Sequence, residues 1–85
     1  FLFLKYLINT LIHHDVFLGK YVTIAPRATI LGSVKVDDYS YIGAGSIIKQ
    51  GVKIGKNCVI GAGAVVLKNI SNNSTVVGNP GKVIK

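Results

Sequence analysis

Large aliphatic residues recur at every sixth position over most of this chain. The series begins at Ile12 and runs without interruption to Val66, and every member is Ile, Leu or Val. A second series lies four positions further on in each unit, from Val16 to Ile70, and holds mainly small or compact residues. Repetition at a fixed short period is typical of repeat architectures, in which each unit packs against its neighbours.

The step of six suits strands and excludes helices. At about 100° per residue, a step of six rotates a helix by roughly 240°, so the aliphatic positions would scatter around its surface. In a strand, steps of six and four are both even, and the two series share one side. Glycines follow several aliphatic positions, where a short strand must turn: Gly19, Gly43, Gly55 and Gly61. The pattern therefore predicts short strands joined by tight turns.

Two nearly identical sequence segments, three hexads apart, indicate the number of strands in each coil. The stretch IGAGSIIK begins at Ile42, and IGAGAVVLK begins at Ile60. Three units of six close a triangular coil, and the fourth unit lies over the first. The sequence thus predicts an all-β fold, a parallel β-helix of hexapeptide repeats over residues 12–71 with a little over three coils. A lead-in of residues 1–11 precedes it, and a cap or tail of residues 72–85 follows.

Composition narrows the classes of partner. The net charge of +7 comes from basic residues spread along the chain, and such a surface attracts polyanions of any kind. Zinc-finger spacing, RNP aromatics and a basic helix are all missing, so a nucleic-acid partner is not expected. The apolar start FLFLKYL is far shorter than the roughly 20 residues of a membrane span, so no membrane partner is expected. The single cysteine, Cys58, fits a reducing compartment such as the cytoplasm and falls in the small series, as a core residue.

One corner of the predicted prism carries chemistry. The unit IHHDVF, from Ile12, holds both histidines and one of the three acidic residues. Histidine takes protons well near neutral pH, and an acidic neighbour can orient it and stabilise its charged form. From the residues alone, His14 with Asp15 is either a general base with its orienting group or a solvated surface turn. Two adjacent histidines are too few for a zinc site, so no metal is predicted.

Two stretches carry a resemblance to a known family. They are IHHDVFLGKYVTIAPRATILG and IGAGAVVLKNI with the later TVVGNPGKVI. They resemble the hexapeptide-repeat acyltransferases, and within them the sialic-acid O-acetyltransferase and UDP-amino-sugar N-acetyltransferase group. The resemblance implies a left-handed parallel β-helix and a homotrimer, with acetyl-CoA bound in the groove between two neighbouring subunits. It also implies that an amino or hydroxyl group of a sugar or nucleotide sugar is acetylated in the cytoplasm.

The resemblance also implies roles for particular residues. His14 matches the catalytic histidine of the family, and Asp15 matches the acidic residue that follows it. Ala44 and Ala62 match the stacked corners whose main chain holds the pantetheine arm of the coenzyme.

Three further positions are implied to contact the coenzyme. Thr23 stands where many family members have a second histidine that meets it, so a hydroxyl replaces a group that can carry charge. Lys68 and Lys82 flank the last coil, where the family places the nucleotide end, and are expected to meet its phosphates.

Three functions remain open from the sequence. The first is an acetyl-CoA-dependent acyltransferase. The second is a truncated, non-catalytic β-helix that serves as a trimerisation or scaffold module, because only a short segment precedes the first hexad where the family has a nucleotide-sugar-binding domain. The third is a basic polyanion binder, whose affinity would fall steeply with salt.

Overall fold

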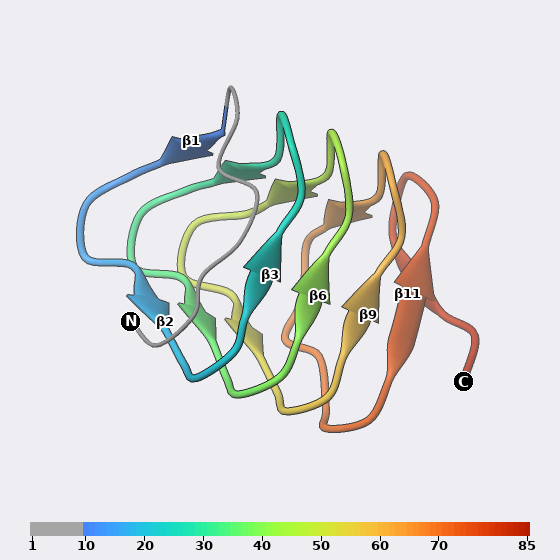
Figure 1. Ribbon diagram of the computed structural model, residues 1–85. Coiled ribbons are helices and arrows are strands. Elements are labelled where there is room, and N and C mark those ends of the chain that lie inside the picture. The colour runs from blue at the N-terminus through green and yellow to red at the C-terminus, as the bar shows by residue number, and fades with distance from the viewer. Residues whose placement is uncertain (1–9) are drawn as a thin grey trace.

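The chain coils into a left-handed parallel β-helix of about four turns (Figure 1). The computed structural model describes residues 10–85, and over that range it contains short strands and no helix. The strands are β1 (Leu11–Ile12), β2 (Phe17–Leu18), β3 (Thr23–Ile24), β4 (Thr29–Ile30), β5 (Lys35–Val36), β6 (Tyr41–Ile42), β7 (Ile47–Ile48), β8 (Lys53–Ile54), β9 (Val59–Ile60), β10 (Val65–Val66), β11 (Thr75–Val77) and β12 (Lys82–Val83). The predicted fold class is confirmed. Most of the predicted lead-in, residues 1–9, lies outside the described residues.

Three sheets form the sides of the prism. Sheet 1 contains β1, β4, β7 and β10; sheet 2 contains β2, β5 and β8; sheet 3 contains β3, β6, β9, β11 and β12. Strands of successive coils pair in parallel, and among the described strands β12 alone pairs antiparallel, against β11. Leu18 pairs with Val36, and Val36 pairs with Ile54, which is the step of 18 that the repeat predicts.

The core is the stack of aliphatic residues that end the two-residue strands. From Leu18 to Val66, these side chains are at most 6% exposed, whereas Ile12, in the first described coil, is partly buried. The small series is buried as well from Val22 onward, including Cys58 at 0% exposure, as predicted. Each buried Ile or Val contributes about 1.5–3 kcal/mol relative to an exposed one, so the regular stack carries most of the stability.

The last coil is shorter than the repeat predicts. The sequence places Ile70 in the small series, but Ile70 bridges Ile54 and so continues the column of large aliphatic residues after a step of 16 rather than 18. The same step of 16 puts Thr75 beside Val59 in sheet 3. Strand β11 therefore adds a row beyond the ten hexads, and this row completes the fourth turn.

The corners stack as tightly as the strands. We call the three columns of turns the histidine corner (His14, Gly32), the tyrosine corner (Tyr21, Tyr39) and the alanine corner (Ala44, Ala62). They join sheet 1 to 2, sheet 2 to 3 and sheet 3 to 1, respectively. Many corner residues adopt positive φ, a conformation that Gly, Asn and Asp tolerate best. The residues are Asp15, Tyr21, Arg27, Ser33, Tyr39, Gly45, Gly51, Asn57, Gly63, Asn73 and Gly78.

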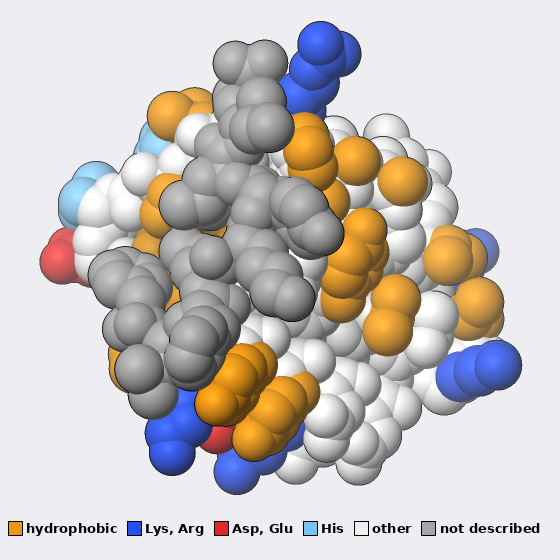
Figure 2. All heavy atoms as spheres, viewed as in Figure 1, with side chains coloured by type: hydrophobic (Ala, Val, Ile, Leu, Met, Phe, Trp, Pro, Cys, Tyr) orange, Lys and Arg blue, Asp and Glu red, His pale blue; other side chains and the backbone are white. Residues whose placement is uncertain are grey.

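Charge is distributed unequally among the three sides. The first residue of each coil strand points outward. In sheet 1 these residues are Leu11, Thr29, Ile47 and Val65, in sheet 3 Thr23, Tyr41, Val59 and Thr75, and in sheet 2 Phe17, Lys35 and Lys53. Figure 2 shows hydrophobic side chains over the strands of sheet 3, with basic side chains at its margins. Sheet 1 is thus uncharged along its strands, sheet 3 carries Lys82 on its antiparallel strand β12, and sheet 2 is basic.

Candidate active site

The histidine corner begins directly after β1. His14 Nε2 lies 4.0 Å from Asp15 Oδ2, and the two side chains are 81% and 79% exposed. Figure 2 shows histidine and acidic side chains together at the left edge of the molecule. Asp15 has a φ of 58°, a conformation that aspartate tolerates better than most residues and that places its carboxylate beside the preceding imidazole. The separation exceeds hydrogen-bond length, so in the free corner the pair is a loose contact.

Gly32 forms the support on which the imidazole lies. A Cβ atom at this glycine would sit 3.6 Å from His14 Cε1 and 3.7 Å from Nε2. The carbonyl of His14 also accepts the N–H of Ser33, at 3.3 Å, which ties the two coils together. Sequence reasoning did not single out Gly32. The step of 18 was the available signal, because it places Gly32 one coil above His14.

The alanine corner stacks small, exposed residues of adjacent coils. Ala44 and Ala62 are both exposed, and the N–H of Gly63 donates to the Ala44 carbonyl at 2.8 Å. Gly43 is needed here because a Cβ atom would lie 2.5 Å from the Ile60 carbonyl oxygen. The two predicted coenzyme positions are therefore brought together in adjacent coils. Thr23 lies half-buried on β3, in the sheet that leads into this corner.

Lys68 and Lys82 line one hollow at the C-terminal end of the helix. The hollow has a volume of about 380 Å³. Its remaining walls are Val66, Leu67, Ile70, Pro80 and Gly81. Both predicted phosphate contacts thus share a single apolar-walled cavity, although they lie on opposite sides of β11 in the chain.

The comparisons with known proteins decide the family. The family model described as "Bacterial transferase hexapeptide (six repeats)" matches residues 15–50 and 33–68, more than half of the chain. The chain belongs to this family.

Relatives of this hexapeptide chain include acetyltransferases. It is 48% identical over 44 residues to GDP-perosamine N-acetyltransferase of Escherichia coli O157:H7, which covers 52% of this chain and 20% of that protein. The acetyltransferase domain of PglB from Neisseria gonorrhoeae FA1090 superposes with a TM-score of 0.93 at 32% identity, covering 95% of this chain and 40% of that one. WeeI from Acinetobacter baumannii AYE gives 0.87 at 40% identity, covering 91% and 39%. The chain spans two fifths or less of the length of these relatives.

In this hexapeptide chain His14 and the pair Ala44 and Ala62 lie at opposite ends of the strands of sheet 1. The histidine corner follows β1, β4 and β7, and the alanine corner precedes β4, β7 and β10. Lys68 belongs to the histidine column, three steps of 18 above His14. Within one chain, therefore, the general-base candidate and Ala44 and Ala62 lie on different corners.

Residues 10–85 contain no group of three or more His, Cys, Asp or Glu side chains placed to hold a metal ion. Those residues also contain no helix long and apolar enough to cross a bilayer.

Proposed function

We propose that this chain is the coenzyme-binding helix of an acetyl-CoA-dependent acyltransferase that acetylates an amino or hydroxyl group of a sugar or nucleotide sugar in the cytoplasm. The observation that carries the proposal is the exposed His14–Asp15 pair lying against Gly32. Support comes from the relatives, because GDP-perosamine N-acetyltransferase is named for a nucleotide-sugar acceptor. The PglB domain, in addition, is solved in complex with acetyl coenzyme A.

His14 is proposed as the general base. Its neutral imidazole accepts the proton of the acceptor amine or hydroxyl as that group attacks the thioester carbonyl. The tetrahedral intermediate then collapses, the carbon–sulfur bond breaks, and the coenzyme leaves as its thiol after taking the proton from the imidazolium. Asp15 stabilises the imidazolium while it carries that proton. A positioned base of this kind is worth about 10²–10⁴ in rate.

The main chain at Gly32 is suited to stabilise the oxyanion. Its N–H makes no backbone hydrogen bond among the described residues, and a Cβ atom at this glycine would lie 3.6 Å from His14 Cε1. A preorganised backbone donor next to the base is the arrangement that tetrahedral intermediates of acyl transfer require. The absence of a side chain at this position leaves room for the thioester carbonyl.

A homotrimer would join the two separated groups of residues. Sheet 1 is uncharged on its outer face, and Leu11 and Ile47 there are 53% and 41% exposed. If three copies turn sheet 1 toward a common axis, the alanine corner of one subunit meets the histidine corner of the next, because these corners are the two edges of that sheet. The coenzyme arm would then run along Ala44 and Ala62, with Thr23 beside it, and reach His14 of the neighbour.

The nucleotide end of the coenzyme is assigned to the hollow between Lys68 and Lys82. Two ammonium groups over an apolar-walled cavity suit phosphates attached to an adenine ring. This hollow lies on the column that also holds His14, so the coenzyme would lie along the helix axis.

The deciding experiment is acetyl-CoA binding by calorimetry, with light scattering on the same sample. We expect saturable binding of one molecule per subunit to a trimer, and acetyl transfer to a sugar amine that His14→Ala lowers by about 10²–10⁴. Binding without any His14-dependent transfer would assign the base elsewhere. An intact trimer that binds no coenzyme would favour the scaffold function.

A further inference from the structure

Acidic side chains are confined to one half of the described β-helix. Residues 10–46, the coils that hold β1 to β6, contain three basic and three acidic side chains, so their formal charge is zero. These side chains are Lys20, Arg27, Lys35, Asp15, Asp37 and Asp38. Residues 47–85 contain six basic side chains and no acidic one, which gives +6. These are Lys49, Lys53, Lys56, Lys68, Lys82 and Lys85. The β-helix is therefore neutral at its N-terminal end and basic at its C-terminal end.

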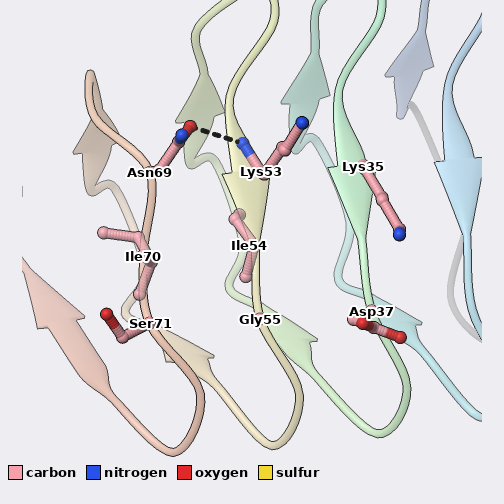
Figure 3. A pocket seen from close by; sticks show the side chains of 8 residues that line it. All are labelled: Lys35, Asp37, Lys53, Ile54, Gly55, Asn69, Ile70 and Ser71. Carbon is pink, nitrogen blue, oxygen red and sulfur yellow. Dashed lines mark hydrogen bonds between the residues drawn. The ribbon is translucent and has the colours of Figure 1, made fainter.

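The stacked columns show how the acidic groups are replaced. Asp37 lies beside Gly55 of the next coil, and Ser71 takes that place in the last coil (Figure 3). In the neighbouring column Asp38 is followed by Lys56, because the register is the same. The repeat thus conserves the buried aliphatic residues from coil to coil while the outer residues change from acidic to neutral or basic.

The six lysines of the basic half have no carboxylate within contact distance. All six are exposed. Over residues 10–85, the His14–Asp15 contact is the one ion pair within 4.0 Å. Asp38 Oδ1, in the neutral half, accepts the N–H of Lys20 at 2.7 Å. A surface of one sign without close counter-charges produces a field that extends into the solvent and attracts ions of the opposite sign.

The charge of coenzyme A is asymmetric in the matching sense. Its phosphates are all at the nucleotide end, whereas the acetylated thiol end is uncharged. In the proposed function the nucleotide end lies between Lys68 and Lys82, in the basic half, and the thioester lies at His14, in the neutral half. The reverse orientation would place the phosphates beside Asp15 and Asp37. The distribution of charge therefore favours one direction of the coenzyme along the helix axis.

We propose that the lysines of the last two coils attract the phosphates of the coenzyme before contact, and so set its association rate and its direction along the β-helix. The inference rests on the proposed function for the identity of the ligand. Lys49 and Lys53 act here from outside the hollow, since neither is among the residues that line it. Their N–H groups donate to Val66 and to the side chain of Asn69, so they lie one coil below Lys68 and on either side of it. A field of this kind raises association rates by about 10–10³.

Association kinetics separate a field from a contact. Charges that act at a distance change the association rate and its salt dependence, whereas the loss of a contact changes the dissociation rate. The variant is Lys49→Gln/Lys53→Gln, and its matched control is Lys20→Gln/Lys35→Gln, which removes the same charge from the neutral half. At about 0.1 M salt the Debye length is about 10 Å, or roughly two strand spacings. The control lysines, two and three coils below Lys68, are then largely screened from it.

Stopped-flow fluorescence with etheno-coenzyme A gives both rate constants, and light scattering shows that each variant keeps the parent's assembly. We expect the variant to lower the association rate about threefold or more at 0.1 M salt, with the dissociation rate within about twofold of the parent. The control should stay near the parent. At 1 M salt, where the Debye length is about 3 Å, the difference should vanish. Equal association rates in the two double variants, or a change confined to dissociation, would overturn the inference.

A second measurement probes the field without the coenzyme. The ¹⁵N-labelled chain is mixed with 3-carboxy-proxyl or with 3-carbamoyl-proxyl, which are an anionic and a neutral nitroxide of similar size, and amide proton relaxation is measured by NMR. The anionic probe should enhance relaxation more over residues 47–85 than over residues 10–46, relative to the neutral probe. A uniform ratio would overturn the inference and leave the proposed function standing. Failure to bind acetyl-CoA, with the anionic probe still concentrated over the last coils, would overturn the proposed function and the identity of the ligand while the field stands.

Discussion

The side-chain carbonyl of Asn69 takes the place of a backbone carbonyl and accepts the N–H of Lys53 at 2.9 Å. In the coil below, the N–H of Lys35 donates to the backbone carbonyl of Val52. The last coil is shortened at this place, and the amide side chain spans the gap. The ladder then resumes, with the N–H of Gly55 donating to the Ile70 carbonyl at 2.9 Å.

Removal of this substitute carbonyl should loosen the last coil. For Asn69→Ala we expect a loss of about 0.5–1.5 kcal/mol in the free energy of unfolding, because one backbone donor loses its partner at an exposed position. Asn69→Asp keeps an acceptor and should lie closer to the parent. Urea denaturation measures the difference, with Gln50→Ala as the control on an exposed corner. Equal stability of Asn69→Ala and the control would mean that water replaces the side chain at no cost.

The proposed catalytic role of Asp15 can be tested separately from its structural role in the turn. Asparagine also tolerates positive φ, so Asp15→Asn should leave the unfolding curve unchanged while removing the charge that stabilises the imidazolium. We expect kcat to fall by about tenfold or more, with little change in coenzyme affinity. Asp38→Asn is the matched control, because an amide oxygen can still accept the N–H of Lys20, as Asn72 does for Lys56. Equal kcat in both variants would remove Asp15 from the mechanism.

Gly32 offers a test of the space beside the imidazole. A methyl group there meets His14 Cε1 at an ordinary contact distance of 3.6 Å, so Gly32→Ala should fold normally. It would fill the position proposed for the thioester carbonyl, and we expect kcat to drop by about 10-fold or more. Gln50→Ala, one coil further along the same column, should be close to the parent. The assignment fails if steady-state kinetics find Gly32→Ala as active as that control.

Two glycines of the alanine corner are required for different reasons: one because the next coil approaches closely, the other because of its backbone conformation. At Gly43 a Cβ atom would lie 2.5 Å from the Ile60 carbonyl oxygen, whereas at Gly45 nothing lies within 4 Å but φ is +67°. Gly45→Ala should cost about 1–2 kcal/mol from the left-handed conformation alone. Gly43→Ala must move backbone and should cost more than that, with loss of acetyl-CoA binding. Thermal unfolding and calorimetry on both variants test the order, which the reverse ranking would contradict.

A charge on sheet 1 should prevent assembly. Ile47 is 41% exposed in the single chain and is proposed to face the trimer axis. Ile47→Lys would place three ammonium groups around that axis, and burial of unpaired charge is costly. Sedimentation should therefore show monomers. Tyr39→Lys adds the same charge at the tyrosine corner, away from sheet 1, and should remain trimeric. A trimeric Ile47→Lys would mean that another side forms the interface.

The hexads were sufficient to predict the sheets, the core and the step of 18, because each depends on a repeated local pattern. The hexads gave the wrong place for Ile70, because counting at a fixed step cannot show that the coil is shortened there. Nor can it show that the side-chain carbonyl of Asn69 replaces a backbone carbonyl. His14 and Asp15 were visible as the interruption of an apolar repeat. The contact between Gly32 and His14 depends on how the coils stack in space. The separation of Ala44 from His14 depends on their positions at opposite ends of the strands of sheet 1.

The regular spacing of the coils also fixes distances along the axis of the β-helix. His14 and Lys68 occupy the same column three coils apart, which at about 4.8 Å per strand spacing is roughly 14 Å. That distance changes only in whole strand spacings, because each coil adds one row whether it holds 18 residues or, as between Ile54 and Ile70, 16. The antiparallel strand β12 covers the C-terminal end of the β-helix, so further coils could be added only between existing coils or at the N-terminal end. The distance between the proposed base, His14, and the proposed phosphate contact, Lys68, is thus fixed in whole steps by how many times the chain turns.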